Sequence, residues 1–155
     1  MNKNSPVYLE DLVVGAEFKS FEHTLDQDQI IKFATEFDPQ PFHTDEEAAK
    51  ETFFKGIAAS GWHTAAITMK LMVESLPFQT GIIGLGGEIA WPRPTRPGET
   101  LRAISTILEI VPSRSKPDRG IVTVECLTLN QNNELCQRFV TKLVVLKKPA
   151  DNLTT

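Results

Sequence analysis

The feature that most constrains the fold is a long apolar helix followed only by strand-like segments. Apolar residues recur every three or four positions from Trp62 to Leu76, which predicts a four-turn helix that ends before Pro77. Further apolar residues beside this stripe indicate that the helix is buried on most sides. The expected stripe consists of Trp62, Ala65, Ala66, Met69, Met72, Val73 and Leu76.

The segments on either side of this helix have different patterns. Before it, we expect a strand over 17–23, a helix capped by Asp26 that ends before Pro39, and a short helix over 44–51 opened by a capping box. The first of these helices has an apolar stripe of Ile30, Phe33, Ala34 and Phe37. After the long helix, strand-like runs cover 88–91, 100–111, 121–129 and 135–146. This order predicts an α+β fold whose mostly antiparallel sheet wraps around the central helix.

The length and composition favour one ordinary cytoplasmic domain. A chain of 155 residues with 41% hydrophobic residues can bury a core without disulfides. The polar first residues lack the pattern of a signal peptide, and no apolar run is long enough for a membrane span. Two cysteines do not make a disulfide framework. We expect a domain over 1–150, a disordered tail over 151–155, and no membrane partner.

The charge distribution argues against a general nucleic-acid binder. The net charge is −4, and all six arginines lie beyond residue 90. Arginine is suited to bidentate phosphate contacts, so this half could meet a phosphate-bearing ligand near 91–119. A solvated sheet face with charged loops explains the same distribution equally well.

Generic catalytic and metal motifs are missing from the sequence. It contains no Walker A loop, no dinucleotide-binding glycine pattern, no zinc-protease motif and no C-x-x-C pair. The three histidines are too scattered to suggest a metal site, so we expect no metal.

Asp38 and His43 form the first candidate site. They lie five residues apart in the segment D-P-Q-P-F-H, where Pro39 and Pro41 favour an extended or turning backbone. A carboxylate and an imidazole on one stiff loop could act together as acid and base on a water molecule. Alternatively, Asp38 ends a helix and His43 packs beside Phe42.

Ser60 and Gly61, at the expected start of the long helix, form the second candidate site. Free N–H groups and the positive end of the helix dipole favour an anion there, and glycine allows a close approach. Such a site could stabilise an enolate formed from a thioester. The alternative is an ordinary serine cap.

Three stretches of sequence resemble one family. Residues 33–45 (FATEFDPQPFHTD) resemble the hydratase-2 motif of MaoC-like dehydratases. Residues 56–64 (GIAASGWHT) look like the glycine-bearing entry to that family's central helix, and 91–101 (WPRPTRPGETL) resemble its proline-glycine strand connection. The resemblance extends over about 7–148. It implies a single hotdog fold, in which a five-stranded antiparallel sheet wraps a long central helix.

The resemblance also implies a reaction and a site. Family members hydrate trans-2-enoyl thioesters of coenzyme A or acyl carrier protein reversibly, and they form homodimers or dimers of dimers. Asp38 and His43 would be catalytic, and the N–H of Gly61 would form the oxyanion hole. No metal or redox cofactor is implied, because coenzyme A is part of the substrate. We further expect Gln40, Phe42, Ser60, Trp62, Arg93 and Arg96 to contact the substrate.

The sequence departs from the family pattern at two positions. Gln40 replaces the usual asparagine, and Ser60 stands where the family often has histidine. These changes affect the expected substrate more than the chemistry. Trp62, Phe53 and Phe54 could shorten the acyl pocket, although core packing would explain them too.

Three functions remain open at this stage. The first is an acyl-CoA hydratase or dehydratase of fatty acid metabolism, which the Asp38/His43 pair favours. The second is a hotdog acyl-CoA thioesterase, which would release a free thiol. The third is a non-catalytic acyl-CoA-binding module, whose ligand binding would survive Asp38→Asn and His43→Ala.

Overall fold

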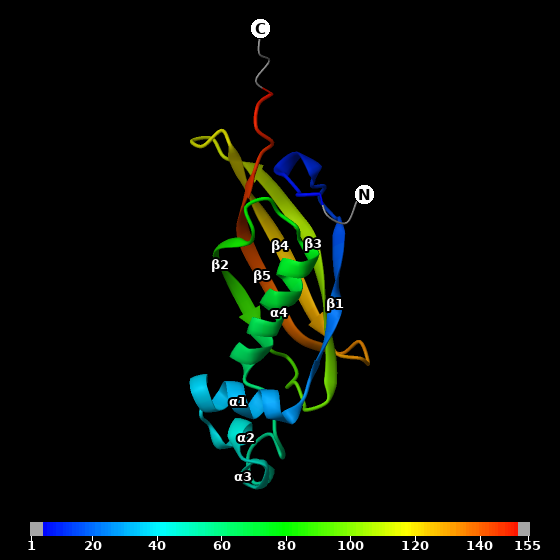
Figure 1. Ribbon diagram of the computed structural model, residues 1–155, viewed down its shortest axis with the longest axis vertical. Coiled ribbons are helices and arrows are strands. Elements are labelled where there is room, and N and C mark those ends of the chain that lie inside the picture. Colours follow the sequence, from blue (N-terminus) through cyan, green and yellow to red (C-terminus); the bar gives the residue numbers. More distant parts are fainter. Residues whose placement is uncertain (1–4, 152–155) are drawn as a thin grey trace.

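A computed structural model describes residues 5–151 as one five-stranded antiparallel sheet curved around a long helix (Figure 1). The order of strands in the sheet is β1-β3-β4-β5-β2. A 3-10 helix, η1 (Leu9–Asp11), precedes the first strand. The strands are β1 (Glu17–Leu25), β2 (Ile83–Ala90), β3 (Glu99–Pro112), β4 (Arg119–Leu129) and β5 (Leu135–Leu146). The expected strands over 100–111, 121–129 and 135–146 are therefore confirmed, and β3 and β4 extend slightly beyond the predicted bounds.

The central helix α4 (Gly61–Ser75) lies in the concave side of the sheet, where it packs mainly against β1 and β3. Leu71 and Met72 are fully buried there, and Leu76 follows them into the core. The predicted α+β hotdog fold, with its long central helix wrapped by the antiparallel sheet, is confirmed.

The buried face of α4 differs from the predicted stripe. Trp62, Met69 and Val73 are 62%, 38% and 54% exposed, so this part of the prediction is wrong. The buried face contains threonines, which an apolar pattern does not count. Thr68 is buried because its hydroxyl shares a hydrogen bond of 2.6 Å with that of Thr128 on β4. The face consists of His63, Thr64, Ile67, Thr68, Leu71 and Met72.

Strand β2 includes a glycine-rich stretch that the sequence pattern does not identify as a strand. We expected a strand over 88–91, whereas pairing with β5 begins at Ile83 and is interrupted between Gly84 and Gly87. A Cβ atom at Gly87 would clash with the carbonyl oxygen of Val140. Glycine at this position therefore allows the two backbones to approach closely.

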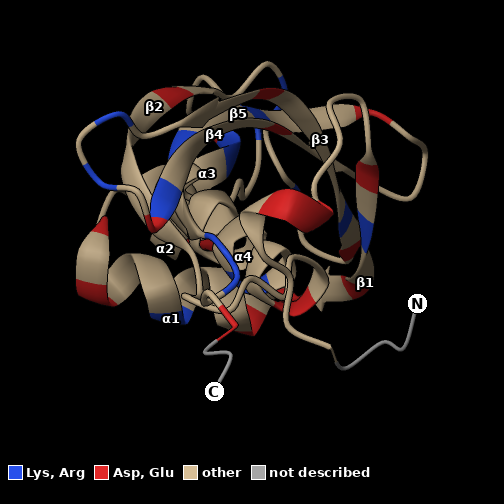
Figure 2. Cartoon of the chain, turned by 90° about the horizontal axis from the view of Figure 1, so that it is seen from above, with Lys and Arg blue, Asp and Glu red and all other residues tan. Residues whose placement is uncertain are grey.

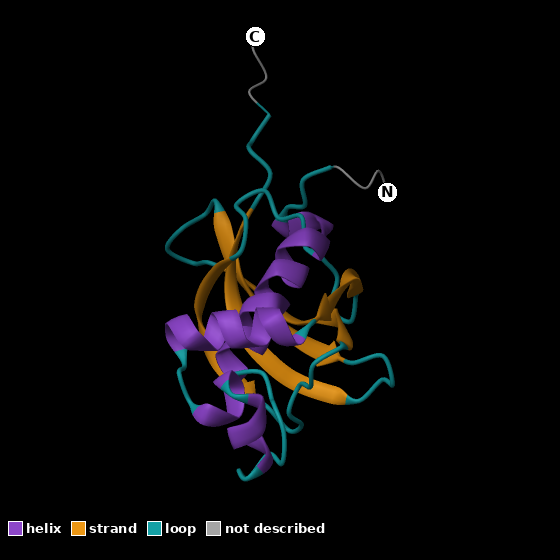
Figure 3. Ribbon diagram, turned by 60° about the horizontal axis from the view of Figure 1, so that its bottom comes forward, coloured by secondary structure: helices purple, strands orange, loops and turns teal. Residues whose placement is uncertain are grey.

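Three helices gather beside the first turns of α4: α1 (Gln27–Phe37), α2 (Pro41–Thr44) and α3 (Glu46–Lys50). Figure 3 shows α1 lying across α4. Asp26 caps α1 as predicted, since its carboxylate accepts a hydrogen bond of 2.8 Å from the N–H of Gln29. Asp45, not Thr44, caps α3 through the N–H groups of Glu47 and Ala48, so the expected capping box is corrected.

Acidic and basic residues are interspersed over the sheet and the helices (Figure 2). Among residues 5–151, no helix is both long enough and apolar enough to cross a bilayer. Apart from Asp151, the predicted tail 151–155 lies outside the described residues.

Candidate functional site

Asp38 lies where the end of α1 meets the beginning of α4. It is the C-cap residue of α1, and its Oδ2 accepts a hydrogen bond of 2.7 Å from Ser60, the N-cap residue of α4. Its Oδ1 accepts a hydrogen bond of 2.6 Å from the side-chain amide of Gln40. The structure therefore brings together three of the predicted site residues and fixes both oxygens of one carboxylate.

His43 faces the same carboxylate from the short helix α2. Its Nδ1 donates a hydrogen bond of 2.6 Å to the carbonyl oxygen of Ala58, which can only accept. Its Nε2 lies 3.2 Å from Oδ2 of Asp38, and the side chain is buried. Nε2 is therefore the atom through which His43 can exchange a proton at this site.

The local backbone around His43 corrects the sequence-based expectation. Two prolines predicted an extended or turning segment, whereas Pro41–Thr44 forms one helical turn. Proline is well tolerated at the first position of a helix, because the N–H that it lacks has no partner there anyway. This turn places the ring of Phe42 edge-on to His43, with 4.5 Å between ring centroids.

The carboxylate of Asp38 is in a setting that keeps it ionised. Partial burial by itself would raise its pKa, but hydrogen bonds from Ser60 and Gln40 and the neighbouring His43 lower the pKa below its ordinary value. Within the described part of the chain, no three His, Cys, Asp or Glu side chains cluster as ligands for a metal ion. The ionisable pair described here consists of the carboxylate of Asp38 and the imidazole of His43.

Gly61 is the first residue of α4, and the indole of Trp91 covers it. Within residues 5–151 its N–H has no hydrogen-bond acceptor, as expected for the first residue of a helix. A Cβ atom at Gly61 would lie 2.8 Å from two ring carbons of Trp91. Nε1 of Trp91 donates a hydrogen bond of 2.9 Å to Oε1 of the buried Gln137. The sequence analysis missed this contact, although Trp91 begins the W-P-R-P segment singled out above.

The bulky residues proposed to shorten an acyl pocket are divided between the site and the surface. Phe54 packs against Phe42, with 5.1 Å between ring centroids, and lies near His43. Phe53 and Trp62 are 90% and 62% exposed in the single chain. Contacts of Trp62 with substrate stay a prediction.

Arg96 is bound to backbone carbonyls close to the site. Its guanidinium donates hydrogen bonds of 3.1 Å to the carbonyl oxygens of Gly56 and Ile57, and one of 2.6 Å to that of Phe54. The next residue after this loop is Ala58, whose carbonyl oxygen holds His43. Arg96 thus supports the acceptor that orients the imidazole. A contact between Arg96 and substrate stays a prediction.

Arg93 also has a protein partner. Its guanidinium forms an ion pair with Glu134, and both side chains are partly exposed. Arg93 and Arg96 thus each have a protein partner in the single chain. A contact between Arg93 and substrate stays a prediction.

We expect Arg96→Met to lower kcat by roughly tenfold to a hundredfold, because small displacements of a catalytic group reduce the rate by such factors. KM should change little if Arg96 only positions the loop, whereas a phosphate contact predicts a rise in KM. Steady-state kinetics distinguishes the two. Arg96→Lys is the conservative control and should restore part of kcat. A large rise in KM with unchanged kcat would contradict the positioning role.

His63 is a buried imidazole, one of the three histidines that are too scattered in the sequence to suggest a metal site. It is 8% exposed and lies flat against Phe33, with 4.4 Å between centroids and 6° between ring planes. Burial is the main reason that its pKa is lowered to about 4, and the nearby His23 lowers it further. Its Nδ1 is buried without a hydrogen-bond partner among the described residues. The ring is therefore neutral at neutral pH.

The lowered pKa of His63 predicts a loss of stability in mild acid. Between pH 6.5 and about 4 the unfolded chain binds a proton that the folded chain does not, so the free energy of unfolding falls as the pH falls. His63 should account for up to roughly 3 kcal/mol of this fall. Urea unfolding at several pH values should show a shallower dependence for His63→Leu. Parallel curves for the two proteins would contradict this expectation.

Comparisons with known proteins show which family the chain resembles. Residues 11–129 match the family described as MaoC like domain. A crystal structure of a MaoC-like dehydratase from Rhodospirillum rubrum is 56% identical, with a TM-score of 0.90 over 92% of this chain and 99% of that chain.

Two further relatives are similar in sequence. An (R)-specific enoyl-CoA hydratase from Rhodospirillum rubrum is 30% identical over 69% of this chain and 74% of its own length. The uncharacterised protein YdeM from Bacillus subtilis is 38% identical over 79% of this chain and 87% of its own length. Both matches span most of the domain.

Proposed function

The chain belongs to the MaoC-like domain family, and we propose that it is a hydro-lyase that reversibly hydrates a trans-2-enoyl thioester of coenzyme A. The observation that carries the proposal is the cluster of Asp38, His43 and Ser60 beside the free N–H of Gly61. The similarity to an (R)-specific enoyl-CoA hydratase supports it.

The first part of the mechanism is the activation of the thioester. Its carbonyl oxygen would accept a hydrogen bond from the N–H of Gly61, at the positive end of the α4 dipole. Donors at this point stabilise the enolate character that develops as the β-carbon is attacked. Trp91 would exclude water from one side of this donor.

The second part is the addition of water. Asp38 and His43 would hold one water molecule beside Oδ2 and Nε2, which are 3.2 Å apart and can both form a hydrogen bond with it. As the water oxygen bonds to the β-carbon, one group accepts its proton, and the other delivers a proton to the α-carbon. The sum is the addition of one water molecule across the double bond. This chemistry needs no metal or redox cofactor, and coenzyme A enters with the substrate.

The test is the ultraviolet absorbance of crotonyl-CoA in the presence of the protein, with a thiol reagent in a parallel sample. We expect the enoyl-thioester band to disappear without release of free thiol. Release of thiol would indicate a thioesterase instead. Binding of the ester without any turnover, unchanged in Asp38→Asn and His43→Ala, would indicate a non-catalytic acyl-CoA-binding module. A positive result would place the protein in acyl-CoA or fatty acid metabolism, which we expect to be cytoplasmic.

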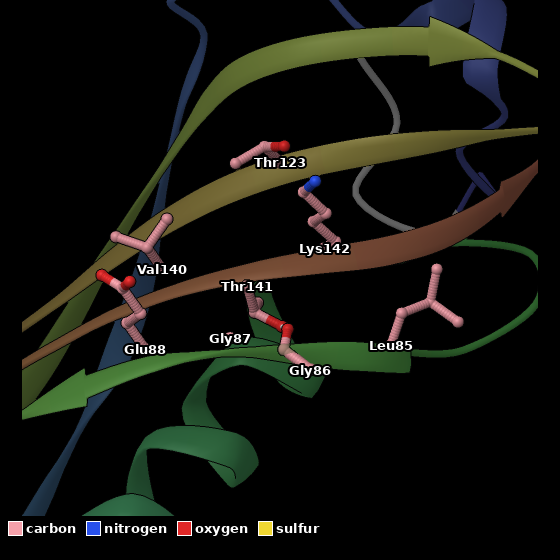
Figure 4. A pocket seen from close by; sticks show the side chains of 8 residues that line it. All are labelled: Leu85, Gly86, Gly87, Glu88, Thr123, Val140, Thr141 and Lys142. Atoms are coloured by element: carbon pink, nitrogen blue, oxygen red, sulfur yellow. The ribbon is translucent and has the colours of Figure 1, made fainter.

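We also propose that the functional unit is a homodimer or a dimer of dimers. Strand β2 lies at the edge of the sheet, and Ile83 and Leu85 on it are 46% and 58% exposed. The exposed residues of α4 add apolar surface. In soluble proteins, exposed sheet edges and large apolar patches are usually covered by a partner. A shallow pocket of about 490 Å³ lies over β2, β4 and β5, where Val140 and Lys142 stand on β5 (Figure 4).

A charge in this surface should separate the copies. We expect Val73→Asp to yield a monomer at micromolar concentration, because a carboxylate buried between apolar faces would be strongly disfavoured. Size-exclusion chromatography with light scattering measures the mass, and circular dichroism checks the fold. Thr35→Asp adds the same charge at an exposed position of α1 and should leave the assembly intact. A parent protein that is monomeric would contradict the proposal.

A further inference from the structure

A pocket of about 290 Å³ lies between α1 and α4, next to the proposed site. Phe37 lines it and is followed directly by Asp38, and His63 lines it two residues after Gly61. The pocket is thus lined by residues that lie next to, or two positions from, both candidate groups in the chain. Its lining residues are His23, Gln29, Lys32, Phe33, Glu36, Phe37, His63 and Ile67.

The inner wall of this pocket is apolar except for one imidazole. Phe33 and Ile67 flank His63, and the stacking on Phe33 fixes the plane of the imidazole. A buried polar group without a hydrogen-bond partner is unfavourable and needs an explanation. Neither ring nitrogen of His63 has a hydrogen-bond partner among the described residues, and only Nδ1 is fully enclosed. Leucine or methionine would fill the same volume without this cost.

The protonation state of His63 indicates which hydrogen-bonding group it can offer to a ligand. The ring is neutral at neutral pH, as argued above, so only one nitrogen carries a proton. Because Nδ1 is closed off and has no acceptor, the proton is better placed on Nε2. Nε2, the ring nitrogen of His63 that is not fully enclosed, then carries one N–H donor beside the apolar inner wall formed by Phe33 and Ile67.

We propose that this pocket binds the distal end of the acyl group and that His63 selects acyl chains carrying a hydrogen-bond-accepting oxygen there. This inference rests on the proposed hydratase function, because it names the class of substrate. A hydroxyl or a carboxylate oxygen has the required chemistry. The oxygen would lie a few bonds beyond the double bond, since His63 is one helical turn or less from Gly61.

The charged side chains at the rim of the pocket do not favour a ligand of either charge. Lys32 and Glu36 are both exposed side chains of α1 at the pocket edge. His23 shares a hydrogen bond of 3.1 Å with Gln29, and Nζ of Lys70 lies 3.4 Å from its Nδ1. Recognition of the acyl end is therefore assigned to the hydrogen bond from His63, and not to an ion pair.

The test compares enoyl-CoA esters of equal length that differ only at the far end. One chain of six carbons ends in a hydroxyl group, a second ends in a carboxylate, and matched plain chains have a methyl group at the same position. We expect the parent protein to prefer an oxygen-bearing chain in kcat/KM by at least about tenfold, because an unpaired buried donor disfavours the plain chain. The hydroxyl and carboxylate chains show which kind of oxygen is used.

Variants assign the preference to one residue. His63→Leu should abolish or reverse the preference, with plain chains gaining. His63→Asn retains a hydrogen-bonding group and should keep part of it. Thr35→Leu introduces the same side chain at an exposed position of α1 outside the pocket lining, and should leave the ratio of the two kcat/KM values nearly unchanged. A parent protein that prefers plain chains, or an unchanged ratio in His63→Leu, would overturn the inference.

A binding measurement separates this inference from the proposed function. Calorimetry with the saturated forms of the same esters measures the pocket without any reaction. The hydratase proposal fails if no enoyl ester is hydrated. The pocket assignment nevertheless stands if the hydroxyl chain binds at least about tenfold more tightly than the plain chain and His63→Leu removes this difference. Equal dissociation constants for the two saturated esters would overturn the pocket assignment, whatever the activity.

Discussion

Asp38→Asn is expected to lower kcat for crotonyl-CoA hydration by roughly a thousandfold, because it removes one member of the acid–base pair. The substitution also disturbs the hydrogen bonds around it. Both carboxylate oxygens of Asp38 accept hydrogen bonds, from Ser60 and from Gln40. An asparagine has only one acceptor oxygen, so its NH₂ group must face one of these donors.

The measurement is the loss of enoyl-thioester absorbance under saturating substrate. His43→Gln serves as the companion variant and should be similarly inactive, since the two residues act on one water. Gln40→Leu is a milder control, because it removes a donor to Asp38 but leaves the pair itself. Activity in Asp38→Asn within tenfold of the parent protein would contradict the assigned role.

Gly61→Ala is expected to impair the site through Trp91. The added methyl carbon would lie 2.8 Å from the indole carbons, so the ring must move and its hydrogen bond to Gln137 is strained or lost. Overpacking of this kind lowers the free energy of unfolding by about 1–3 kcal/mol. Displacement of the N–H donor should lower kcat by roughly tenfold to a hundredfold.

Urea unfolding and hydration kinetics measure the two effects of Gly61→Ala separately. Gly84→Ala is the matched control, because its Cβ atom would meet only the Thr141 hydroxyl oxygen, at 4.0 Å. Adding Trp91→Leu to Gly61→Ala should recover part of the lost stability by making room. A Gly61→Ala protein with the stability and activity of the parent would show that the close approach of Trp91 is unimportant.

The sequence predicted the fold well where patterns of propensity and the family resemblance agreed. The strand β5 begins and ends at the predicted residues, and Asp26 caps α1 as expected. The predicted buried face of α4 was wrong because Thr64 and Thr68 are buried there. Their hydroxyl groups form hydrogen bonds with the hydroxyl groups of threonines in other segments. No periodicity within one helix can reveal a partner 31 or 60 residues away.

The candidate site was predictable in part. Asp38, His43 and Gly61 were identified from one short segment and one helix start. In the structure, the carboxylate of Asp38 lies beside His43 and accepts a hydrogen bond from Ser60, which precedes Gly61. The supporting contacts were missed because they join distant parts of the chain. Arg96 reaches a loop about 40 residues earlier, and Trp91 reaches Gln137 on another strand. Such contacts depend on tertiary packing and leave no signal in local spacing.

The arrangement of the chain also has a consequence for the order of folding. Asp38, His43 and Ser60 lie within 23 residues of one another, whereas β1 must pair with β3 across about 80 residues of intervening sequence. Contacts between distant residues slow folding, because the ordering of long loops precedes any gain from pairing. The hydrogen bonds among the polar groups of the site can therefore form as local contacts before the sheet closes. Only closure of the sheet brings Trp91 and Gln137 together over the start of α4, so the apolar cover of the site is completed late.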